Sequence, residues 1–401
     1  MGRSQRGERV IVSDSPRRGR SSLAEAFRDK SVLVTGHTGF KGAWLSSWLL
    51  GLGARVAGFA LSPPTEPSLF DKLGLDRCMA HRIGDVRDLE AVGQRVDEVE
   101  PEVVFHLAAQ SIVRVSYSEP IETFATNVLG TAHVLEAIRQ RGRPCVVLIV
   151  TSDKCYENRE QKVALAEDDP LGGRDPYSAS KGAAEIVTAA YRRSFFPLGQ
   201  YEAHGVAVAS ARAGNVIGGG DWATDRLVPD IVRAVAEGQP PELRHPEAVR
   251  PWQHVLDALA GYLRLAQLML DDGPSGLAEA WNFGPLDDPA EPVLTVGELT
   301  DRILDRWTDG SRMTWAAAPQ PAAPHEARYL RLDARKAVAR LGWRPVWNVE
   351  RTVDETVRWY REDHERGDMA SFTAAQIRDY CASAQRSGLG WVTGPERRRA
   401  R

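Results

Sequence analysis

Short, strongly apolar runs alternate with longer amphipathic segments over the first half of the chain. The run at residues 146–150 is continuous and mostly β-branched, which is typical of a parallel strand buried on both faces. Comparable runs predict strands over residues 30–35, 54–61 and 206–212, together with one that ends at Ile83 and one that begins at Val103. Because helical patterns separate these strands, the sequence predicts an α/β fold, a Rossmann-like doubly wound parallel sheet with right-handed crossovers.

A glycine-rich turn joins the first predicted strand to the first long helical pattern. Its glycines follow the spacing Gly36-x-x-Gly39-x-x-Gly42. Glycines there permit a tight turn and let backbone N–H groups approach a pyrophosphate, to which the helix N-terminus adds its dipole. The turn therefore predicts a dinucleotide site. The sequence leaves open whether His37 and Lys41, inside the turn, touch a cofactor phosphate or are simply exposed.

A tyrosine and a lysine follow Pro176 with helical spacing. Pro176 is placed to begin a helix, and Tyr177 and Lys181 would share one of its faces. An ammonium beside a phenol lowers the pKa of the phenol, so that such a tyrosine can accept a proton from a substrate hydroxyl. The pair is a weak signal alone, and it gains weight from the nucleotide-binding pattern that precedes it.

Polar residues begin abruptly where the run at residues 146–150 ends, with Ser152, Asp153 and Lys154 in succession. Ligands bind at this carboxyl edge of open α/β sheets. An aspartate there can also cap a turn, and a lysine can be a solvated strand-end charge. Because the tyrosine–lysine pair is expected across the same crevice, we favour a catalytic interpretation.

Other strand ends supply candidate cofactor contacts. Asp85 follows the third predicted strand, and small residues follow Leu107 at the end of the fourth, so that a cofactor can lie against the backbone there. The end of the second strand carries no carboxylate before Glu66 and no isolated arginine. This strand therefore leaves the choice between NAD and NADP open.

The pattern loses its regularity after the sixth strand. We expect a Rossmann domain over residues 30–213 and a smaller C-terminal substrate-binding lobe over residues 214–382, interleaved with the first. Residues 1–29 are polar and rich in arginine, and residues 383–401 end in a basic run. We therefore predict a flexible extension at the first and a flexible basic tail at the second.

Composition narrows the class of protein. The 401 residues are 43% hydrophobic and 26% charged with a formal net charge of −3, so no overall basic field points to nucleic acid. No apolar run is long enough to span a bilayer, and no membrane partner is expected. The four cysteines show neither metal-binding spacing nor a disulfide framework, which is typical of a cytoplasmic protein. The histidines are unpaired in sequence as well, so we expect no metal site.

Several motifs together resemble those of extended short-chain dehydrogenase/reductases that act on nucleotide sugars. They are residues 36–42, Asp85-Val86, residues 107–110, Tyr177-x-x-x-Lys181 and Arg212-x-x-Asn215, and the likeness covers roughly residues 30 to 362. Within that group, the stretches at residues 36–42, 152–158, 218–222 and 250–255 are similar to those of CDP-glucose 4,6-dehydratases.

The resemblance implies a set of site residues. For NAD, the expected cofactor-binding residues are Gly36, His37, Thr38, Gly39, Phe40, Lys41, Gly42, Asp85, Val86, Leu107, Ala108, Ala109, Gln110, Asn127, Tyr177 and Lys181. The expected catalytic residues are Ser152, Asp153, Lys154, Tyr177 and Lys181, and the expected substrate-binding residues are Asn215, Arg226 and Arg250.

The resemblance also implies a reaction. Such a lyase oxidises C4 of the sugar with tightly held NAD, eliminates water across C5 and C6, and returns the hydride to C6. Better-known hexose dehydratases carry Thr-Asp-Glu where this chain has Ser152-Asp153-Lys154. Asp153 would then protonate the leaving hydroxyl, and Lys154 must replace the glutamate as the base at C5. The identity of that base stays open.

Alternative functions remain within the same group. A nucleotide-sugar 4-epimerase shares Tyr177 and Lys181 but needs no acid/base pair for elimination, and a dehydratase of another NDP-hexose would be expected to keep the glutamate. A cofactor-sensing binding protein should lack Tyr177 or Lys181, and both are present. We expect a nucleotide-sugar substrate and a homo-oligomer, either a dimer or a tetramer.

Overall fold

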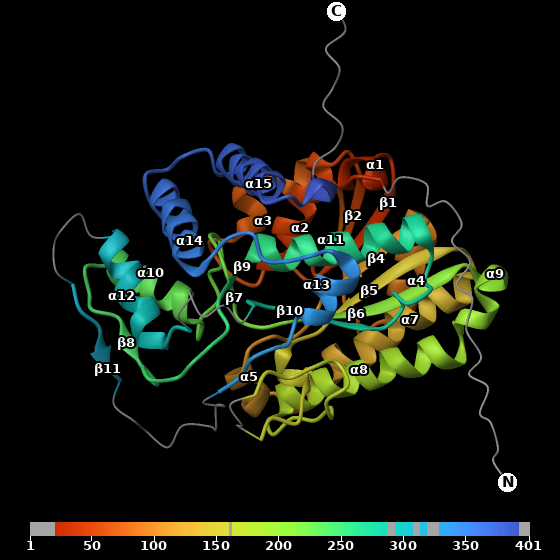
Figure 1. Ribbon diagram of the computed structural model, residues 1–401, viewed down its shortest axis with the longest axis horizontal. Helices are drawn as coiled ribbons and strands as arrows, with labels where there is room; N and C mark the ends of the chain where they lie inside the picture. Colours follow the sequence, from red (N-terminus) through yellow and green to blue (C-terminus); the bar gives the residue numbers. More distant parts are fainter. Residues whose placement is uncertain (1–20, 160–162, 287–292, 308–312, 319–328, 393–401) are drawn as a thin grey trace, which may run out of the picture.

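A seven-stranded parallel sheet forms the centre of the computed structural model, which describes residues 21–159, 163–286, 293–307, 313–318 and 329–392. Its strand order is β10-β6-β5-β4-β1-β2-β3 (Figure 1). The strands are β1 (Ser31–Thr35), β2 (Arg55–Ala60), β3 (Ala80–Ile83), β4 (Val103–His106), β5 (Cys145–Val150), β6 (Val206–Ala213) and β10 (Ala280–Phe283). The order reverses between β1 and β4, and ligands bind at such a switch point. The predicted Rossmann-like fold is confirmed.

Helices cover both faces of this sheet, and the strand side chains alternate accordingly. In β5, Val146, Leu148 and Val150 pack into one hydrophobic core, while Val147 and Ile149 pack into the other. This alternation explains why the strand reads as a continuous apolar run. One face is covered by α2 (Phe40–Gly51) and α11 (Val255–Asp272), and the other by α4 (Leu89–Val99), α7 (Gly130–Arg141) and α8 (Pro176–Ser194) (Figure 1).

The seventh strand comes from the segment that the sequence assigned to the smaller lobe. β10 pairs in parallel with β6, with Trp281 opposite Ala211 and Phe283 opposite Ala213. The preceding α11 covers the sheet, so the Rossmann part is not limited to residues 30–213. Sequence analysis found six strands because β10 is only four residues long and has no β-branched residue.

The smaller lobe contains two short parallel ribbons and several helices. Strand β7 (Val216–Ile217) pairs with β9 (Gln253–His254), and β8 (Glu242–Leu243) pairs with β11 (Ala316–Ala317). In Figure 1 its helices α10 and α12 lie at one end of the sheet, and α15 returns to the Rossmann part. The bounds are α10 (Leu227–Ala236), α12 (Val296–Trp307), α13 (Arg335–Leu341), α14 (Val349–His364) and α15 (Met369–Arg386). Tyr380 of α15 meets Trp48 of α2 edge to face, with ring centroids 5.6 Å apart.

The two ends of the chain that were predicted to be flexible both contain ordered segments. Within residues 1–29, α1 (Leu23–Phe27) begins with a capping box and buries both of its terminal apolar side chains, with Phe27 6.3 Å from Phe105 between ring centroids. Within residues 383–401, α15 continues to Arg386 and Val392 is buried. The prediction of flexibility is therefore wrong for residues 21–29 and 383–392, and its other parts lie outside the described residues.

Short helices complete the described chain. They are α3 (Leu69–Lys72), η1 (Leu75–Arg77), α5 (Val113–Ser118), α6 (Pro120–Phe124), the π-helix η2 (Ala125–Leu129), the 3₁₀ turns η3 (Asp153–Cys155), η4 (Leu198–Gln200) and η5 (Gly390–Val392), and α9 (Tyr201–His204). Within the described ranges, no helix combines the length and the apolar character needed to cross a membrane.

Candidate active site

The carboxyl ends of β1, β2, β4, β5 and β6 open into a crevice of about 700 Å³ that the smaller lobe helps to enclose. Its walls include all but two of the residues that the sequence assigned to a site. These are Gly36, Thr38, Gly39, Phe40, Lys41, Gly42, Asp85, Val86, Leu107, Ala108, Ala109, Gln110, Ser152, Asp153, Lys154, Tyr177, Lys181, Asn215, Arg226 and Arg250. His37 and Asn127 lie behind the wall.

The glycine-rich turn forms a tight cradle at the start of α2. Gly36 has a φ of +75°, and a Cβ there would lie 2.6 Å from the backbone nitrogen of Ala108. A Cβ on Gly42 would lie 2.1 Å from the carbonyl oxygen of Gly36. Gly39 precedes the helix without any side-chain cap, so the first turn of α2 presents its N–H groups to the crevice. The cradle therefore fits a pyrophosphate.

His37 does not belong to this cradle. Its ring is fully buried beneath β2, where a Cβ on Gly58 would lie 2.4 Å from it, and it packs against Phe70 and His81. Burial lowers the pKa of His37 to about 4, so the ring is neutral. The sequence left open whether His37 touches a cofactor phosphate or is simply exposed. The structure shows neither, because His37 is a buried core residue.

Asn127 supports the crevice from behind. Its side chain is 1% exposed, and its amide nitrogen donates to the Gln110 carbonyl at 2.9 Å and to Ser180 Oγ at 2.8 Å. Its amide oxygen accepts from the backbone of Gln110 at 2.9 Å. These bonds tie the segment after β4 to α8. Asn127 can therefore shape the cofactor wall, but it does not line it.

Asp85 lies at the end of β3 and is paired within its own turn. Arg87 donates to Asp85 Oδ2 at 2.6 and 2.8 Å, and this hydrogen bonding holds the pKa of Asp85 below its usual range. Thr38 donates to the Leu61 carbonyl at 2.9 Å, which fixes the end of β2 beside the glycine turn. This end of the crevice thus offers hydroxyl and backbone groups and one carboxylate that is paired with an arginine.

A tight turn after β5 carries the expected acid. Ser152 Oγ donates to Asp153 Oδ1 at 2.9 Å and accepts from the Lys154 backbone at 3.2 Å. A Cβ on Gly214 would lie 2.8 Å from Pro251 Cγ and 3.0 Å from Asp153 Oδ2, so glycine at this position lets the carboxyl lie close to the backbone. Burial raises the pKa of Asp153, although Lys154 and Ser152 oppose the shift. A buried carboxyl of this kind can hold a proton and donate it. Lys154 is half-buried on the same wall.

Tyr177 and Lys181 face this turn from α8. Burial raises the pKa of Tyr177 to about 12, and a hydrogen bond with Ser152 and the charge of Arg226 oppose that rise. Burial lowers the pKa of Lys181 to about 8, and its ammonium donates to the Val150 carbonyl at 3.4 Å. From the spacing of the two residues, we expected Lys181 to lower the pKa of Tyr177. Here burial outweighs every charge, and Arg226 is the cation that acts on the phenol.

Cationic side chains line the opposite wall of the crevice. Burial and the charge of Arg226 lower the pKa of Lys41 to about 7. Arg226 donates to Asp221 Oδ2 at 3.0 Å and to Ser111 Oγ at 2.8 Å, so it is already oriented. Arg250 is 8% exposed at the end nearer the smaller lobe. Asp221 was not among the predicted site residues, although this aspartate directly follows the glycine run at residues 218–220.

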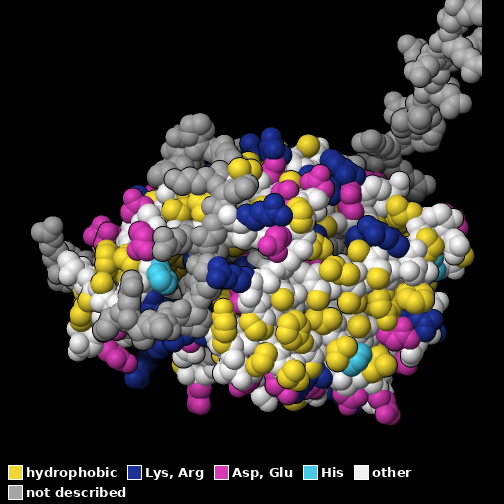
Figure 2. Space-filling view, turned by 90° about the horizontal axis from the view of Figure 1, so that it is seen from below, with side chains coloured by type: hydrophobic (Ala, Val, Ile, Leu, Met, Phe, Trp, Pro, Cys, Tyr) yellow, Lys and Arg dark blue, Asp and Glu magenta, His cyan; other side chains and the backbone are white. Residues whose placement is uncertain are grey.

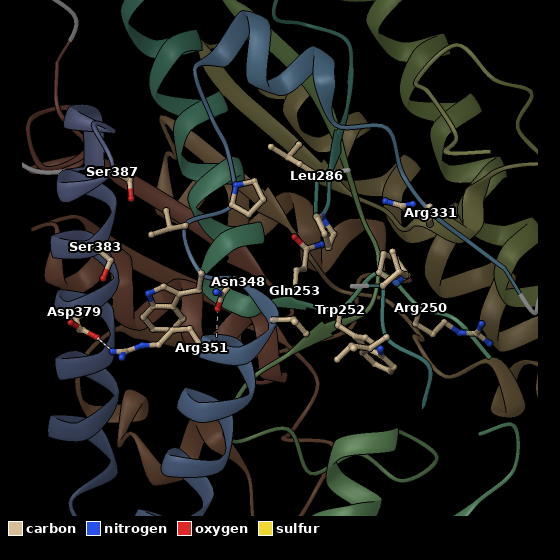
Figure 3. A pocket seen from close by; sticks show the side chains of 18 of the residues that line it. Arg250, Trp252, Gln253, Leu286, Arg331, Asn348, Arg351, Asp379, Ser383 and Ser387 are labelled. Atoms are coloured by element: carbon tan, nitrogen blue, oxygen red, sulfur yellow. Dashed lines mark hydrogen bonds and ion pairs between the residues drawn. The ribbon is translucent and has the colours of Figure 1, made fainter. Parts of the chain in front are cut away.

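A second hollow of about 740 Å³ lies behind Trp252. Figure 3 shows Arg250 and Arg331 on one side of it and the ion pair of Arg351 with Asp379, 2.5 Å apart, on the other. None of the expected catalytic residues lines this hollow. The residues that were predicted to be catalytic line the crevice instead, and Arg331, which was not among the predicted site residues, is a neighbour of Arg250.

The described part of the chain holds no group of three or more His, Cys, Asp or Glu side chains placed to bind a metal ion. Among the titratable groups that line the crevice, the predicted catalytic residues supply the carboxyl of Asp153, the phenol of Tyr177 and the ammonium groups of Lys154 and Lys181. Such a set suits proton transfer to and from a sugar.

Comparisons with known proteins agree with this geometry. The chain is 48% identical over 360 residues to a CDP-glucose 4,6-dehydratase of Salmonella typhimurium, an alignment that covers 90% of this chain and 98% of the relative. It is 28% identical to a dTDP-glucose 4,6-dehydratase of Xanthomonas campestris, over 82% of this chain and 92% of the relative.

Solved structures show the same architecture. A dTDP-glucose 4,6-dehydratase of Streptomyces venezuelae, solved with NAD bound, superposes with a TM-score of 0.67 at 27% identity, covering 84% of this chain and 99% of that one. The family model described as GDP-mannose 4,6 dehydratase matches residues 33–356. This chain therefore belongs to the GDP-mannose 4,6 dehydratase family of NAD-dependent nucleotide-sugar enzymes.

Proposed function

We propose that the protein is a lyase that converts CDP-glucose to CDP-4-keto-6-deoxyglucose with bound NAD. The observation that carries the proposal is the buried carboxyl of Asp153, held by Ser152 in a turn that faces Tyr177 across the crevice. An epimerase has no use for a proton donor at C6, whereas an elimination requires one. The 48% identity to a CDP-glucose 4,6-dehydratase, against 28% to a dTDP-glucose enzyme, supports the choice of nucleotide.

The side chains that were predicted to be catalytic then have distinct roles in the reaction. Bound NAD supplies the hydride acceptor at C4 and the donor at C6. Tyr177 takes the proton of the C4 hydroxyl in its phenolate form, which the charge of Arg226 and the hydrogen bond with Ser152 favour against the effect of burial, and Ser152 hydrogen-bonds the same oxygen. Asp153, whose pKa is raised by burial, protonates the hydroxyl that leaves C6.

Lys154 is the proposed base at C5, because it follows Asp153 on the same wall of the crevice. Lys41 is the second lysine that lines the crevice near Asp153, and its lowered pKa would also suit a base. The two lysines come from different elements, so substitution can separate their roles.

The remaining predicted residues bind the two ligands. The glycine turn with Thr38, Phe40 and the ends of β3 and β4 would hold NAD. Asn215, Arg226 and Arg250 would hold the diphosphate of the substrate, because guanidinium groups suit phosphate oxygens. Lys181 would orient the cofactor beside Tyr177, since its ammonium lies at the end of β5.

An apolar face supports the expected homo-oligomer, for which we propose a second copy of this chain as the occupant. Large exposed hydrophobic side chains gather on α5, α6, η2 and α8, namely Tyr117, Ile121, Phe124, Leu129 and Ile186. Figure 2, which views the molecule from the side of α8, shows hydrophobic side chains spread over this face. Two such faces can bury each other by packing helix against helix.

We propose a cytoplasmic location because the cysteine thiols are not joined in disulfides. All four cysteines are free, and Cys145 and Cys155 are buried without a disulfide. Free thiols of this kind suit a reducing compartment.

We predict that Gly39→Ala weakens NAD binding without changing thermal stability. A Cβ at Gly39 meets no atom closer than 3.5 Å in the protein, so a loss of binding would come from the cofactor side of the turn. We expect a dissociation constant at least about tenfold higher by calorimetry, which corresponds to ~1.4 kcal/mol. Gly51→Ala, at an open position of the same helix, is the control. Equal NAD affinity in Gly39→Ala would place the cofactor elsewhere.

CDP-glucose should have the highest kcat/KM among CDP-, dTDP-, UDP-glucose and GDP-mannose under matched conditions. The assay follows the alkali-induced absorbance of the 4-keto product and the reduced cofactor in parallel. Because the hydride returns to C6, product should form without stoichiometric reduced cofactor. Preference for another nucleotide would contradict the substrate assignment, and a C4 epimer as the product would identify an epimerase.

Tyr177→Phe and Lys154→Met should stop the reaction at different points. Without its proton acceptor, Tyr177→Phe should lose C4 oxidation by about 10²–10⁴-fold, the usual range for acid–base groups. Lys154→Met leaves the tyrosine in place, so a single turnover should show transient reduced cofactor while exchange of the C5 proton with deuterated water is slowed. Normal exchange in Lys154→Met would give the base role to another residue, and Lys41→Met is the matched variant to examine.

The protein should sediment as a dimer or a higher oligomer, and Ile121→Asp should reduce that state to the monomer. Ile121 is 77% exposed on the apolar face, where a buried charge in an interface would be costly. Leu198→Asp, at an exposed position outside this face, is the control. A wild-type protein that stays monomeric at all concentrations, or an Ile121→Asp variant that assembles normally, would contradict the proposal.

A further inference from the structure

A buried carboxylate lies behind the crevice, at a position to which the proposed reaction gives no role. Glu185 belongs to α8, one turn after Lys181 and two turns after Tyr177, and its side chain is 3% exposed. It does not line the crevice. An unpaired carboxylate at such a depth would cost several kcal/mol, so its partners explain how it is kept there.

The partners of Glu185 lie on β6 and directly after β5. Thr151 Oγ1, directly after β5, donates to Glu185 Oε1. On β6, Ser210 Oγ donates to Oε2 at 2.7 Å and the Arg212 guanidinium donates to Oε2 at 2.9 Å. Glu185 therefore fastens α8 to the strand end that continues into Ser152 and Asp153.

Lys181 makes the adjacent contact in the same direction. Its ammonium donates to the Val150 carbonyl at 3.4 Å, one residue before Thr151. Two residues of one face of α8 thus hold two consecutive residues at the end of β5. The distance between Tyr177 and the Ser152 turn depends on this clamp, because Tyr177 lies on the same helix.

Glu185 is an anion in this setting. Burial raises its pKa, but the Arg212 guanidinium and the hydroxyls of Thr151 and Ser210 bring the pKa below its usual range. Arg212 is itself oriented by Tyr156, whose hydroxyl it contacts at 2.7 Å, and by the Glu167 carbonyl at 3.0 Å. The charge of Glu185 is therefore fixed in position.

Three titratable groups face Lys181 from the surrounding elements, and a fourth lies on α8 itself. Cys155 of η3 and His106 of β4 are neutral, because burial raises the pKa of the thiol and lowers that of the imidazole to about 3. Lys41 of α2 is a like charge that disfavours a second ammonium. Glu185, on α8 itself, is the group that opposes the effect of burial on Lys181.

We propose that Glu185 is a positioning residue of the active site, which holds the end of β5 against α8 through Thr151 and places a buried anion one helical turn from Lys181. The inference rests on the proposed function for the reaction that it serves. The charge on Lys181, however, can be measured without substrate, so the two proposals fail separately.

Glu185→Gln tests the charge, because glutamine keeps the shape and can still accept from Thr151. The pKa of Lys181 already lies below its usual value, and loss of the neighbouring anion should lower it further, by about one to two pH units for a unit charge one helical turn away at an effective dielectric of ~20. Lys181 would then lose its proton at a lower pH. Carbon-13 NMR of lysine-labelled protein, assigned with Lys181→Met, reads this titration directly.

The same shift should appear in catalysis. The basic limb of kcat/KM against pH should move to lower pH in Glu185→Gln by the amount that NMR gives for Lys181. Thr151→Val tests the second part, since it removes the hydroxyl and keeps the charge. It should lower kcat at every pH and leave the Lys181 titration within a few tenths of its wild-type value.

Glu355→Gln is the matched control for burial alone. Glu355 is 1% exposed on α14 and is paired with Arg351 and Arg358, away from the crevice. It should lower the melting temperature without moving the titration of Lys181 or the pH profile.

If Glu185→Gln does not fold, Glu185→Gln/Arg212→Met removes the buried pair together and should still lower the pKa of Lys181. An unchanged Lys181 titration in either Glu185 variant, or a Thr151→Val variant with wild-type kcat, overturns the proposal.

Discussion

Burial of ionisable groups at the carboxyl ends of the central strands is the constraint on which the rest of the site depends. Water is excluded there, so each group is charged or neutral according to whether a partner offsets the cost of burial. Asp153 lacks a sufficient partner, and its pKa rises, whereas Glu185 has Arg212 and stays ionised. Two carboxyls on neighbouring elements thus have pKa values that are shifted in opposite directions, and each shift suits its position.

The fold supplies this contrast through its layers. Strands β5 and β6 run between two helical layers, so the polar residues that follow them are enclosed on both sides. The smaller lobe contributes Asp221, Arg226 and Arg250 to the wall across from α8. Helix α15 returns to pack on α2, which fixes the lobe against the part that carries the glycine turn. The acid, the phenol and the cations are therefore held by different segments that cannot move independently.

Much of this arrangement could be predicted from the sequence, because the carboxyl ends of parallel strands meet at one edge. The glycine turn, the Ser152 turn and the Tyr177 helix follow strong local patterns, and the structure brings them to one crevice. Their roles stay predictions. What could not be predicted depends on distant contacts, such as the pocket for His37 beneath Gly58.

Two further differences between the predicted and the observed structure also depend on contacts that are distant in the sequence. Strand β10 is short and lacks β-branched residues, and only its pairing with β6 makes it a strand. The pKa of Tyr177 depends on its burial in the folded protein, which outweighs the local spacing to Lys181. Glu185 gave no signal in the sequence, because one carboxylate in an amphipathic helix is ordinarily a solvated charge.

The proposed reaction requires that one hydride leaves C4 and returns to C6 of the same sugar nucleotide. The most direct measurement is to incubate the enzyme with CDP-glucose deuterated at C4 and to locate the deuterium in the product by NMR and mass spectrometry. The account predicts a CDP-4-keto-6-deoxyglucose that carries the deuterium on C6. Deuterium that is released to solvent, retained in the reduced cofactor or found again on C4 would contradict it.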